Sequence, residues 1–130
     1  MKKFVIYRIT FPTGQFYIGR TYHNIDLRLN RHLTSLKKGS HGNTTMQEIY
    51  NEYGSKEFNI EVLLEDESDD RYYVNLLENY LICDHPNTIN YYKGRKSDKQ
   101  LGSYLKEMRK IYNSKHSYGG KRINQKALLT

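Results

Sequence analysis

Apolar and polar residues near the N-terminus are arranged in two short runs that predict a β-hairpin. Residues 5–11 and 15–20 are rich in β-branched and aromatic side chains, and Pro12, Thr13 and Gly14 separate them. A three-residue hairpin loop is a type I turn followed by a residue in the left-handed region. Proline suits the first position and glycine the last, so the turn residues favour this loop.

The predicted turn fixes the register of the two strands. Ile9 is expected to pair with Tyr17, and Tyr7 with Gly19. Because side chains alternate across a strand, the two tyrosines should share one face as diagonal neighbours. Gly19 has no side chain and is expected to leave an opening beside both hydroxyls. Two phenols that face such an opening suggest a site rather than a core.

Three later segments carry apolar residues at helical spacing. They predict helices over about 25–38, from Thr44 to the residue before Gly54, and from Ser68 to the residue before Pro86. The three apolar stripes are Ile25, Leu29, Leu33 and Leu36; Met46, Ile49, Tyr50 and Tyr53; and Tyr73, Leu76, Leu77, Tyr80 and Leu81.

Local signals support the starts of the first two helices. Asn24 is the expected N-cap of the first, and Thr44 with Gln47 has the spacing of a capping box in the second. Within the first helix, Arg28 and His32 are four residues apart. They are therefore expected on one face, at the edge of the apolar stripe, where a polar group can reach a cleft.

Alternation of Phe58, Ile60, Val62 and Leu64 with mostly polar neighbours predicts a third strand with one buried face. The order strand, strand, helix, helix, strand, helix indicates an α+β domain over residues 1–92. We expect a three-stranded antiparallel sheet flanked by helices.

Residues 93–130 differ from the rest of the chain in charge. Residues 1–92 hold ten Lys and Arg against twelve Asp and Glu, a net −2, whereas 93–130 hold eleven against two, a net +9; together they give +7. A linker, a short amphipathic helix around 98–113 and a flexible end are predicted there. This basic extension suggests a polyanionic partner that is bound in a salt-dependent way.

The composition also excludes several classes of protein. A single cysteine, Cys83, rules out an internal disulfide framework and a cysteine-based zinc site. No apolar run approaches the ~20 residues of a membrane span, and no secretory signal is recognisable. A soluble protein of the reducing cytoplasm, without a membrane partner, is therefore expected.

Hydrolysis of a phosphodiester needs a base for the attacking water, stabilisation of phosphoryl charge, and help for the leaving oxygen. Tyr7 and Tyr17 are candidates for the base, through one deprotonated phenol or through a relay between the two. Phenol titrates near pH ~10, so Tyr7 would need positive charge from a cation or an arginine nearby. Arg28 offers that charge and a fork of donors for phosphate, and His32 can donate to phosphate or shuttle a proton. Glu78 is an acid beside an apolar stripe. A hard cation bound there would compensate the negative charge of its carboxylate.

Residues 5–7 (Val-Ile-Tyr) and 17–19 (Tyr-Ile-Gly) resemble the paired signature of the GIY-YIG nuclease family, with Val5 in place of the first glycine. The spacing of the tyrosines and the order of the elements are also similar to that family. The resemblance covers roughly residues 4–92. It implies that the fold is the GIY-YIG fold and that the activity is phosphodiester hydrolysis.

The resemblance also implies roles for single residues. Tyr7 is the expected general base, Tyr17 its hydrogen-bonded supporter, and Arg28 the phosphate clamp. His32 fills the histidine position of the family, and Glu78 is the expected ligand of a Mg²⁺ or Mn²⁺ cofactor.

The family places an asparagine after the third helix. Asn90 is the choice here and Asn87 a competitor, while Lys93 is a third occupant of that place, because this chain has Asn-Tyr-Tyr-Lys where the family often has Gly-Tyr-Asn. Contacts to DNA are expected from Arg20, Arg31, His41, Lys93, Arg95, Lys96, Arg109, Lys110, Lys121 and Arg122.

These features predict a metal-dependent DNA endonuclease, acting on double-stranded DNA and of the phage or mobile-element homing type. An inactive DNA-binding or structure-recognising protein is the alternative, and an RNA-directed nuclease is a third. Metal-dependent cleavage separates the first two, and a comparison of DNA with RNA substrates addresses the third.

Overall fold

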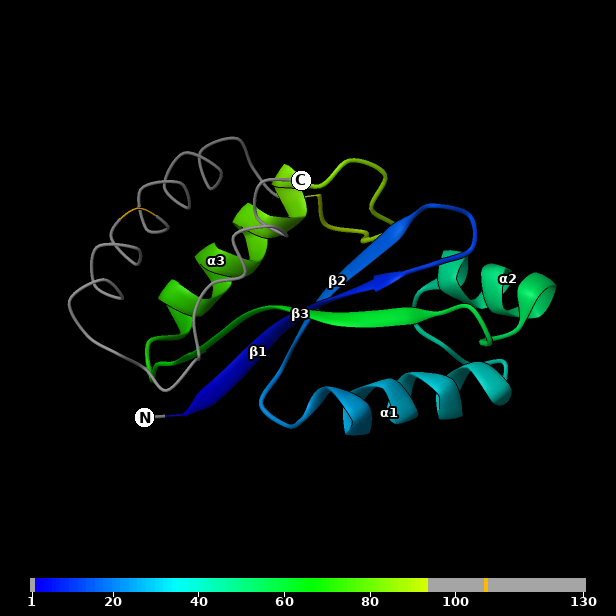
Figure 1. Cartoon of the computed structure of the whole chain (residues 1–130), viewed down its shortest axis with the longest axis horizontal. Helices are drawn as coiled ribbons and strands as arrows, with labels where there is room; N and C mark the ends of the chain where they lie inside the picture. Colours follow the sequence, from blue (N-terminus) through cyan, green and yellow to red (C-terminus); the bar gives the residue numbers. More distant parts are fainter. Residues whose placement is uncertain (1, 94–106, 108–130) are drawn as a thin grey trace.

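The computed structural model describes residues 2–93 and Glu107. Its centre is a three-stranded antiparallel sheet (Figure 1). The strands are β1 (Lys3–Thr10), β2 (Phe16–Thr21) and β3 (Asn59–Glu67), and their spatial order is β2-β1-β3. The predicted α+β fold with a three-stranded antiparallel sheet is therefore confirmed.

The hairpin between β1 and β2 has the predicted loop and register. The Phe11 amide donates to the Gln15 carbonyl at 3.0 Å, and Gly14 has a φ of 84°, in the region that favours glycine. Ile9 pairs with Tyr17. Residue 7 pairs with residue 19, as the turn chemistry required.

Three helices cover the sheet, namely α1 (Ile25–Lys37), α2 (Thr44–Tyr53) and α3 (Arg71–Asp84). The Asn24 side chain caps α1 by accepting from the amide of residue 27, as predicted. The cap of α2 differs, because Asn43 rather than Thr44 accepts an amide, that of residue 46, at 3.0 Å.

The capping box predicted at Thr44 and Gln47 is therefore wrong. The Gln47 side chain donates to the carbonyl of Leu36 and accepts from the amide of His41. The Gln47 side chain therefore bonds to α1 and to the α1–α2 loop and does not bond to the N-terminus of its own helix.

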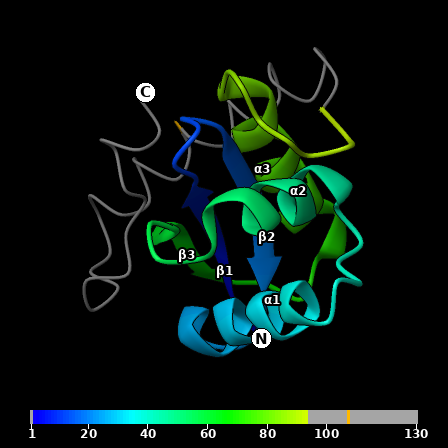
Figure 2. The ribbon, with the colours of Figure 1, turned by 90° about the vertical axis from the view of Figure 1, so that its right-hand side faces the viewer.

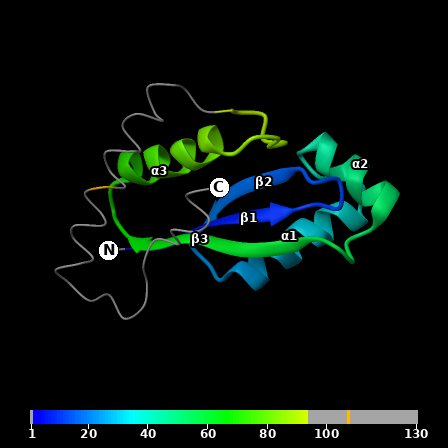
Figure 3. The ribbon, with the colours of Figure 1, turned by 45° about the horizontal axis from the view of Figure 1, so that its top comes forward.

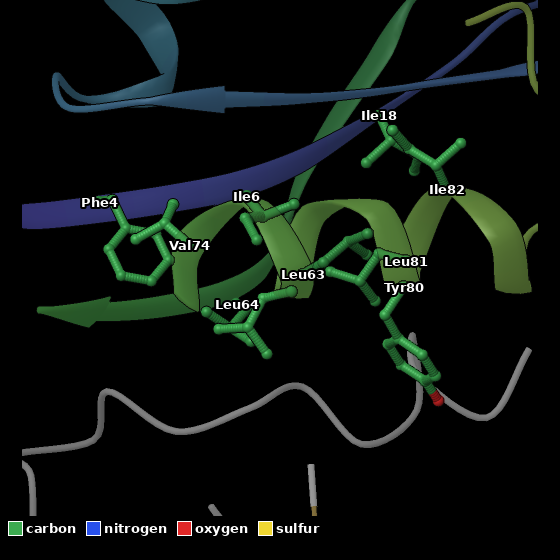
Figure 4. Close-up of a cluster of buried hydrophobic side chains, with 10 residues drawn as sticks. Phe4, Ile6, Ile18, Leu63, Leu64, Val74, Tyr80, Leu81 and Ile82 are labelled. Carbon is green, nitrogen blue, oxygen red and sulfur yellow. The ribbon is translucent and has the colours of Figure 1, made fainter. Parts of the chain in front are cut away.

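The helices lie on opposite faces of the sheet, with α3 on one face and α1 and α2 on the other (Figures 1, 2 and 3). Each face has its own apolar cluster. The α3 cluster, drawn in Figure 4, holds Phe4, Ile6, Ile18, Leu63, Leu64, Val74, Leu77, Tyr80, Leu81 and Ile82. The α1/α2 cluster is built on Tyr7, Ile9, Phe11, Leu36, Met46, Ile49 and Ile89.

Strand β3 departs from its predicted alternation. Its pairing with β1 shifts between Ile6 and Tyr7, which pair with Leu64 and Val62, so Leu63 is an extra residue. Both Leu63 and Leu64 consequently pack in the α3 cluster, whereas Ile60 packs in the α1/α2 cluster. The prediction that Leu64 shares a face with Ile60 is wrong, because a β-bulge reverses the parity of the strand.

The chain after α3 returns to the edge of β2. The amide of Phe16 donates to the carbonyl of Asn87 at 3.0 Å, and the amide of Ile89 donates to Phe16 at 2.8 Å. Asn87 has a φ of 60° in this connection.

Within the described part of the chain, no helix is both long and apolar enough to cross a membrane. The predicted linker, helix and flexible end after residue 93 lie outside the described residues, apart from Glu107, and the division at 92/93 stays a prediction.

Candidate active site

Tyr7 is fully buried, and its phenol fills the space that Gly19 leaves on β2. A Cβ built on Gly19 would lie 2.3 Å from the Tyr7 oxygen and 3.0 Å from Cε2 of Tyr17. The opening expected beside Gly19 therefore exists, but the phenol of Tyr7 occupies it. Any side chain at position 19 would displace that phenol.

A cleft of about 400 Å³ adjoins the two tyrosines. Tyr17 lines it directly and meets Tyr7 ring to ring, with centroids 6.4 Å apart and planes tilted by 43°. The other lining residues are Arg28, Arg31, His32, Ser35, His41, Gly42, Asn43, Asn90 and Tyr91. The predicted candidates Tyr17, Arg28, His32 and Asn90 thus come together from β2, α1 and the segment after α3.

A chain of hydrogen bonds leads away from the Tyr7 hydroxyl. The hydroxyl oxygen lies 2.8 Å from His32 Nε2, and His32 Nδ1 lies 2.8 Å from His41 Nε2. The amide of Asn43 donates to His41 Nδ1 at 2.9 Å. His32 is only 3 % exposed, although the sequence placed it at the margin of α1. The His32 ring is held in this position by its hydrogen bond with the Tyr7 hydroxyl and by stacking with the imidazole of His41.

Burial dominates the electrostatics of this group. Burial raises the pKa of Tyr7, neighbouring Tyr17 raises it further, and the charge and hydrogen bond of Arg28 oppose both effects. The pKa of Tyr17 is also raised by burial and opposed by Arg28. Burial, Arg28 and His41 together lower the pKa of His32 to about 3. His32 is therefore a neutral imidazole at pH 7.

Glu78 lies on α3, on the other side of β2. Its carboxylate is 3.4 Å from Nε of Arg20, and the Arg20 guanidinium also donates to Asn75. Burial raises the pKa of Glu78, and Arg20 opposes that effect. Arg20, predicted to contact DNA, is thus directed at α3 in this structure. Among residues 2–93 and 107, no group of three or more His, Cys, Asp and Glu side chains could hold a metal ion.

Of the three candidates for the family asparagine, only Asn90 lines the cleft. Its side chain accepts from the amide of Ile18 at 3.0 Å and donates to the carbonyl of Ile18 at 2.7 Å. Asn87 is exposed, and the ammonium of Lys93 donates to the carbonyl of Thr88. Asn90 therefore holds β2 at the residue before Gly19.

Four lining residues were not singled out from the sequence, namely Ser35, Gly42, Asn43 and Tyr91. Asn43 is 7 % exposed and joins α2, His41 and the carbonyl of Ile89. The Tyr91 hydroxyl accepts from the amide of Thr44 at 2.7 Å. Asn43 stands directly before the predicted helix, so a search for single-residue caps would have found it. The Tyr91 contact spans 47 residues and has no local signal. The candidates Arg95, Lys96, Arg109, Lys110, Lys121 and Arg122 lie outside the described residues.

Sequence and structure comparisons agree with this geometry. A family model described as the GIY-YIG catalytic domain matches residues 3–93. The solved catalytic domain of the intron endonuclease I-TevI, in a mutant form, superposes with a TM-score of 0.60 and 24 % identity, covering 72 % of this chain and 97 % of that one. No curated protein matches the chain significantly.

The family match shows that this domain, with its cleft lined by Tyr17, arginines and histidines, is a nuclease domain, the class of enzyme that hydrolyses phosphodiester bonds. The chain belongs to the GIY-YIG family. Its substrate class is accordingly DNA.

Proposed function

We propose that this chain is an endonuclease that cuts double-stranded DNA with the help of a divalent cation, Mg²⁺ or Mn²⁺. The observation that carries the proposal is the convergence of Tyr17, Arg28 and His32 on one cleft, with Tyr7 directly behind them. Burial is the main cause of the raised pKa of both phenols, and the charge of Glu78 adds to it, which supports a role for this carboxylate beside the two tyrosines.

Tyr7 is the proposed general base, and Tyr17 is its partner at the surface of the cleft. Tyr7 is fully buried and does not line the cleft, so its oxygen has to become accessible before an attacking water can reach it. Arg28 favours the phenolate form of both tyrosines, because its charge lowers the pKa of each. Tyr7 acts in its phenolate form: after the phenolic proton has passed to solvent, the phenolate oxygen takes the proton of the attacking water as the water oxygen approaches phosphorus.

Arg28 is the proposed phosphate clamp. Its guanidinium lines the cleft and offers a planar fork of donors that matches two oxygens of one phosphate. Arg31 lines the same cleft and is exposed, so it is placed to contact a neighbouring phosphate. The basic residues of 93–130, with a net +9, would add affinity that is independent of sequence.

Glu78 is the proposed ligand of the divalent cation. It is a partly buried carboxylate, 23 % exposed, whose neutralisation by Arg20 is incomplete because burial still raises its pKa. One carboxylate fits Mg²⁺, which usually keeps several waters and binds one or two protein carboxylates plus substrate phosphate. When bound, the cation would stabilise negative charge on the phosphate and the leaving oxygen.

The biological role proposed is that of a phage or mobile-element enzyme of the homing type. The structural similarity to the catalytic domain of an intron endonuclease supports this role.

Cleavage of supercoiled plasmid in Mg²⁺ tests the proposal. We expect nicked or linear product from the native chain and none with chelator or with Glu78→Gln. Glu52→Gln, at an exposed acid on α2, is the matched control and should cut normally. A gel shift without cleavage on supercoiled, branched and linear DNA would instead establish the DNA-binding alternative, and cleavage of RNA alone would establish the RNA nuclease.

A further inference from the structure

We infer that the backbone amide of Asn43 sets the direction of the hydrogen-bond chain through His41 and His32, so that His32 donates to the oxygen of Tyr7. His41 is then a positioning residue for Tyr7 and not a contact to DNA. The inference deepens the proposed function, on which the catalytic importance of Tyr7 rests.

The first step concerns the tautomer of His41. A backbone amide can only donate, so the 2.9 Å contact from Asn43 requires an unprotonated Nδ1 in His41. In a neutral imidazole the proton then resides on Nε2. The His41 amide also donates to Oε1 of Gln47 at 3.2 Å, which fixes the backbone that carries the ring.

The second step transfers this direction to His32. Nε2 of His41 lies 2.8 Å from Nδ1 of His32, and the two rings stack with centroids 5.1 Å apart. Because His41 donates, Nδ1 of His32 must accept. A neutral His32 then carries its proton on Nε2, the atom that lies 2.8 Å from the Tyr7 oxygen. Its lowered pKa, about 3, keeps the imidazole neutral at pH 7.

The direction of the chain decides what His32 can do for Tyr7. Nε2 of His32 already holds a proton, so it cannot accept the proton of the phenol. The Tyr7 oxygen instead receives a hydrogen bond from His32, and the positive charge of Arg28 favours its phenolate form. A hydrogen-bond donor and a nearby positive charge both favour the phenolate over the neutral phenol.

Asn43 is held firmly enough to impose this direction. Its side-chain oxygen accepts from the Met46 amide at 3.0 Å, and its side-chain nitrogen donates to the carbonyl of Ile89 at 2.9 Å. The residue is 7 % exposed. Both anchors belong to the side chain, whereas the bond to His41 belongs to the backbone. Substitution at residue 43 can therefore weaken the anchors without removing the donor.

Nitrogen-15 NMR of the free, metal-free chain with labelled histidine is the decisive measurement at pH 7. We expect both His32 and His41 as neutral rings with the proton on Nε2. Asn43→Ala should leave both tautomers unchanged while lowering thermal stability, because it keeps the amide and loses the anchors. A His32 ring with its proton on Nδ1 would overturn the inference.

Two substitutions at position 41 connect the tautomer to catalysis. His41→Gln retains a side-chain donor near the place of Nε2, whereas His41→Leu removes it. We expect the His32 tautomer and the Mg²⁺-dependent plasmid cleavage rate to be preserved better in the glutamine variant, with about tenfold slower cleavage in the leucine variant. Equal loss of rate in two folded variants, or loss of DNA affinity with an unchanged His32 tautomer, would contradict a positioning role.

The tautomers of His32 and His41 can be tested independently of the proposed function. The NMR result requires neither DNA nor metal, so a chain with the expected tautomers that fails to cut would refute the nuclease proposal alone. A chain that cuts DNA with His32 in the opposite tautomer would refute this inference alone.

Discussion

The two faces of the sheet use the same strands but have different interiors. Towards α3, Phe4 and Ile6 pack with aliphatic side chains of the helix in a cluster whose described members are almost all apolar. Towards α1 and α2, the next residue of β1 is Tyr7, and its hydroxyl meets an imidazole inside the apolar cluster. One strand therefore supplies stability on one face and chemistry on the other, through the alternation of its side chains.

The polar face of the sheet depends for its stability on the apolar face. A buried phenol and imidazole gain little net stability from their hydrogen bond, which contributes roughly 1 kcal/mol. The α3 face buries several large side chains, each contributing about 1.5–3 kcal/mol. Four substitutions separate these contributions, from the largest expected effect to the smallest.

Tyr7→Phe should produce the largest functional effect with little loss of stability. Removal of the hydroxyl abolishes the proposed base and its bond to His32 but keeps the ring in the core. We expect cleavage slower by about 10²–10⁴-fold, with a change in unfolding free energy of about 1 kcal/mol. Plasmid cleavage and urea unfolding measure the two, and Tyr72→Phe, on an exposed tyrosine of α3, is the matched control. A rate close to that of the native chain would remove Tyr7 from the mechanism.

Leu63→Ala should show the opposite pattern. Leu63 is fully buried at the bulge of β3 and faces α3. Truncation should lower the unfolding free energy by about 2–5 kcal/mol. The cleavage rate of the fraction that remains folded should stay within a few-fold of native, as measured at a temperature well below the transition. A large rate loss in fully folded protein would show that the two faces are coupled.

Gly19→Ala should damage both properties at once. The new Cβ would lie 2.3 Å from the Tyr7 oxygen, so the phenol must move away from His32. We expect the cleavage rate to decrease about as much as in Tyr7→Phe. The unfolding free energy should decrease by about 1–3 kcal/mol. Gly42→Ala is the control for stability, since nothing lies within 4 Å of a Cβ there. Equal melting temperatures for the two alanine variants would argue against the close packing of Tyr7 on β2.

The smallest effect expected is a pH dependence of stability that originates in His32. Its pKa is lowered from 6.5 to about 3 in the folded chain, so the unfolded chain binds the proton more readily. Stability should therefore fall as the pH drops from about 6.5 towards 3, by up to about 2 kcal/mol between pH 7 and pH 5. His32→Gln should reduce this difference, and His23→Gln, at an exposed histidine, should leave it unchanged. Urea unfolding at the two pH values provides the measurement.

The sequence predicts the parts of this molecule that depend on neighbours in the chain. Pro12 and Gly14 were enough to fix the hairpin register, and with it the pairing of residue 7 with residue 19. Asn24 capped the helix that it was expected to cap. The family resemblance named Tyr17, Arg28, His32 and Asn90 as site residues, and all four line one cleft in the structure. Their catalytic roles stay proposals.

The remainder arises from contacts between distant residues. The bulge at Leu63 is a property of the pairing with β1, and an alternating run of residues does not reveal it. The stacking of His41 on His32 and the grip of Asn90 on Ile18 likewise join separate elements. Complete burial of Tyr7 follows from how a ring fits over a glycine of another strand, which depends on three-dimensional packing.

The connection after α3 has a consequence for the behaviour of the chain at high concentration. The edge of a sheet exposes amides and carbonyls that can recruit a strand from another molecule. Here the backbone of Phe16 and both backbone groups of Ile18 are already bonded to residues 87–90 of the same chain. The segment that brings Asn90 to the cleft thus also occupies these pairing positions on β2, and it protects that edge from self-association.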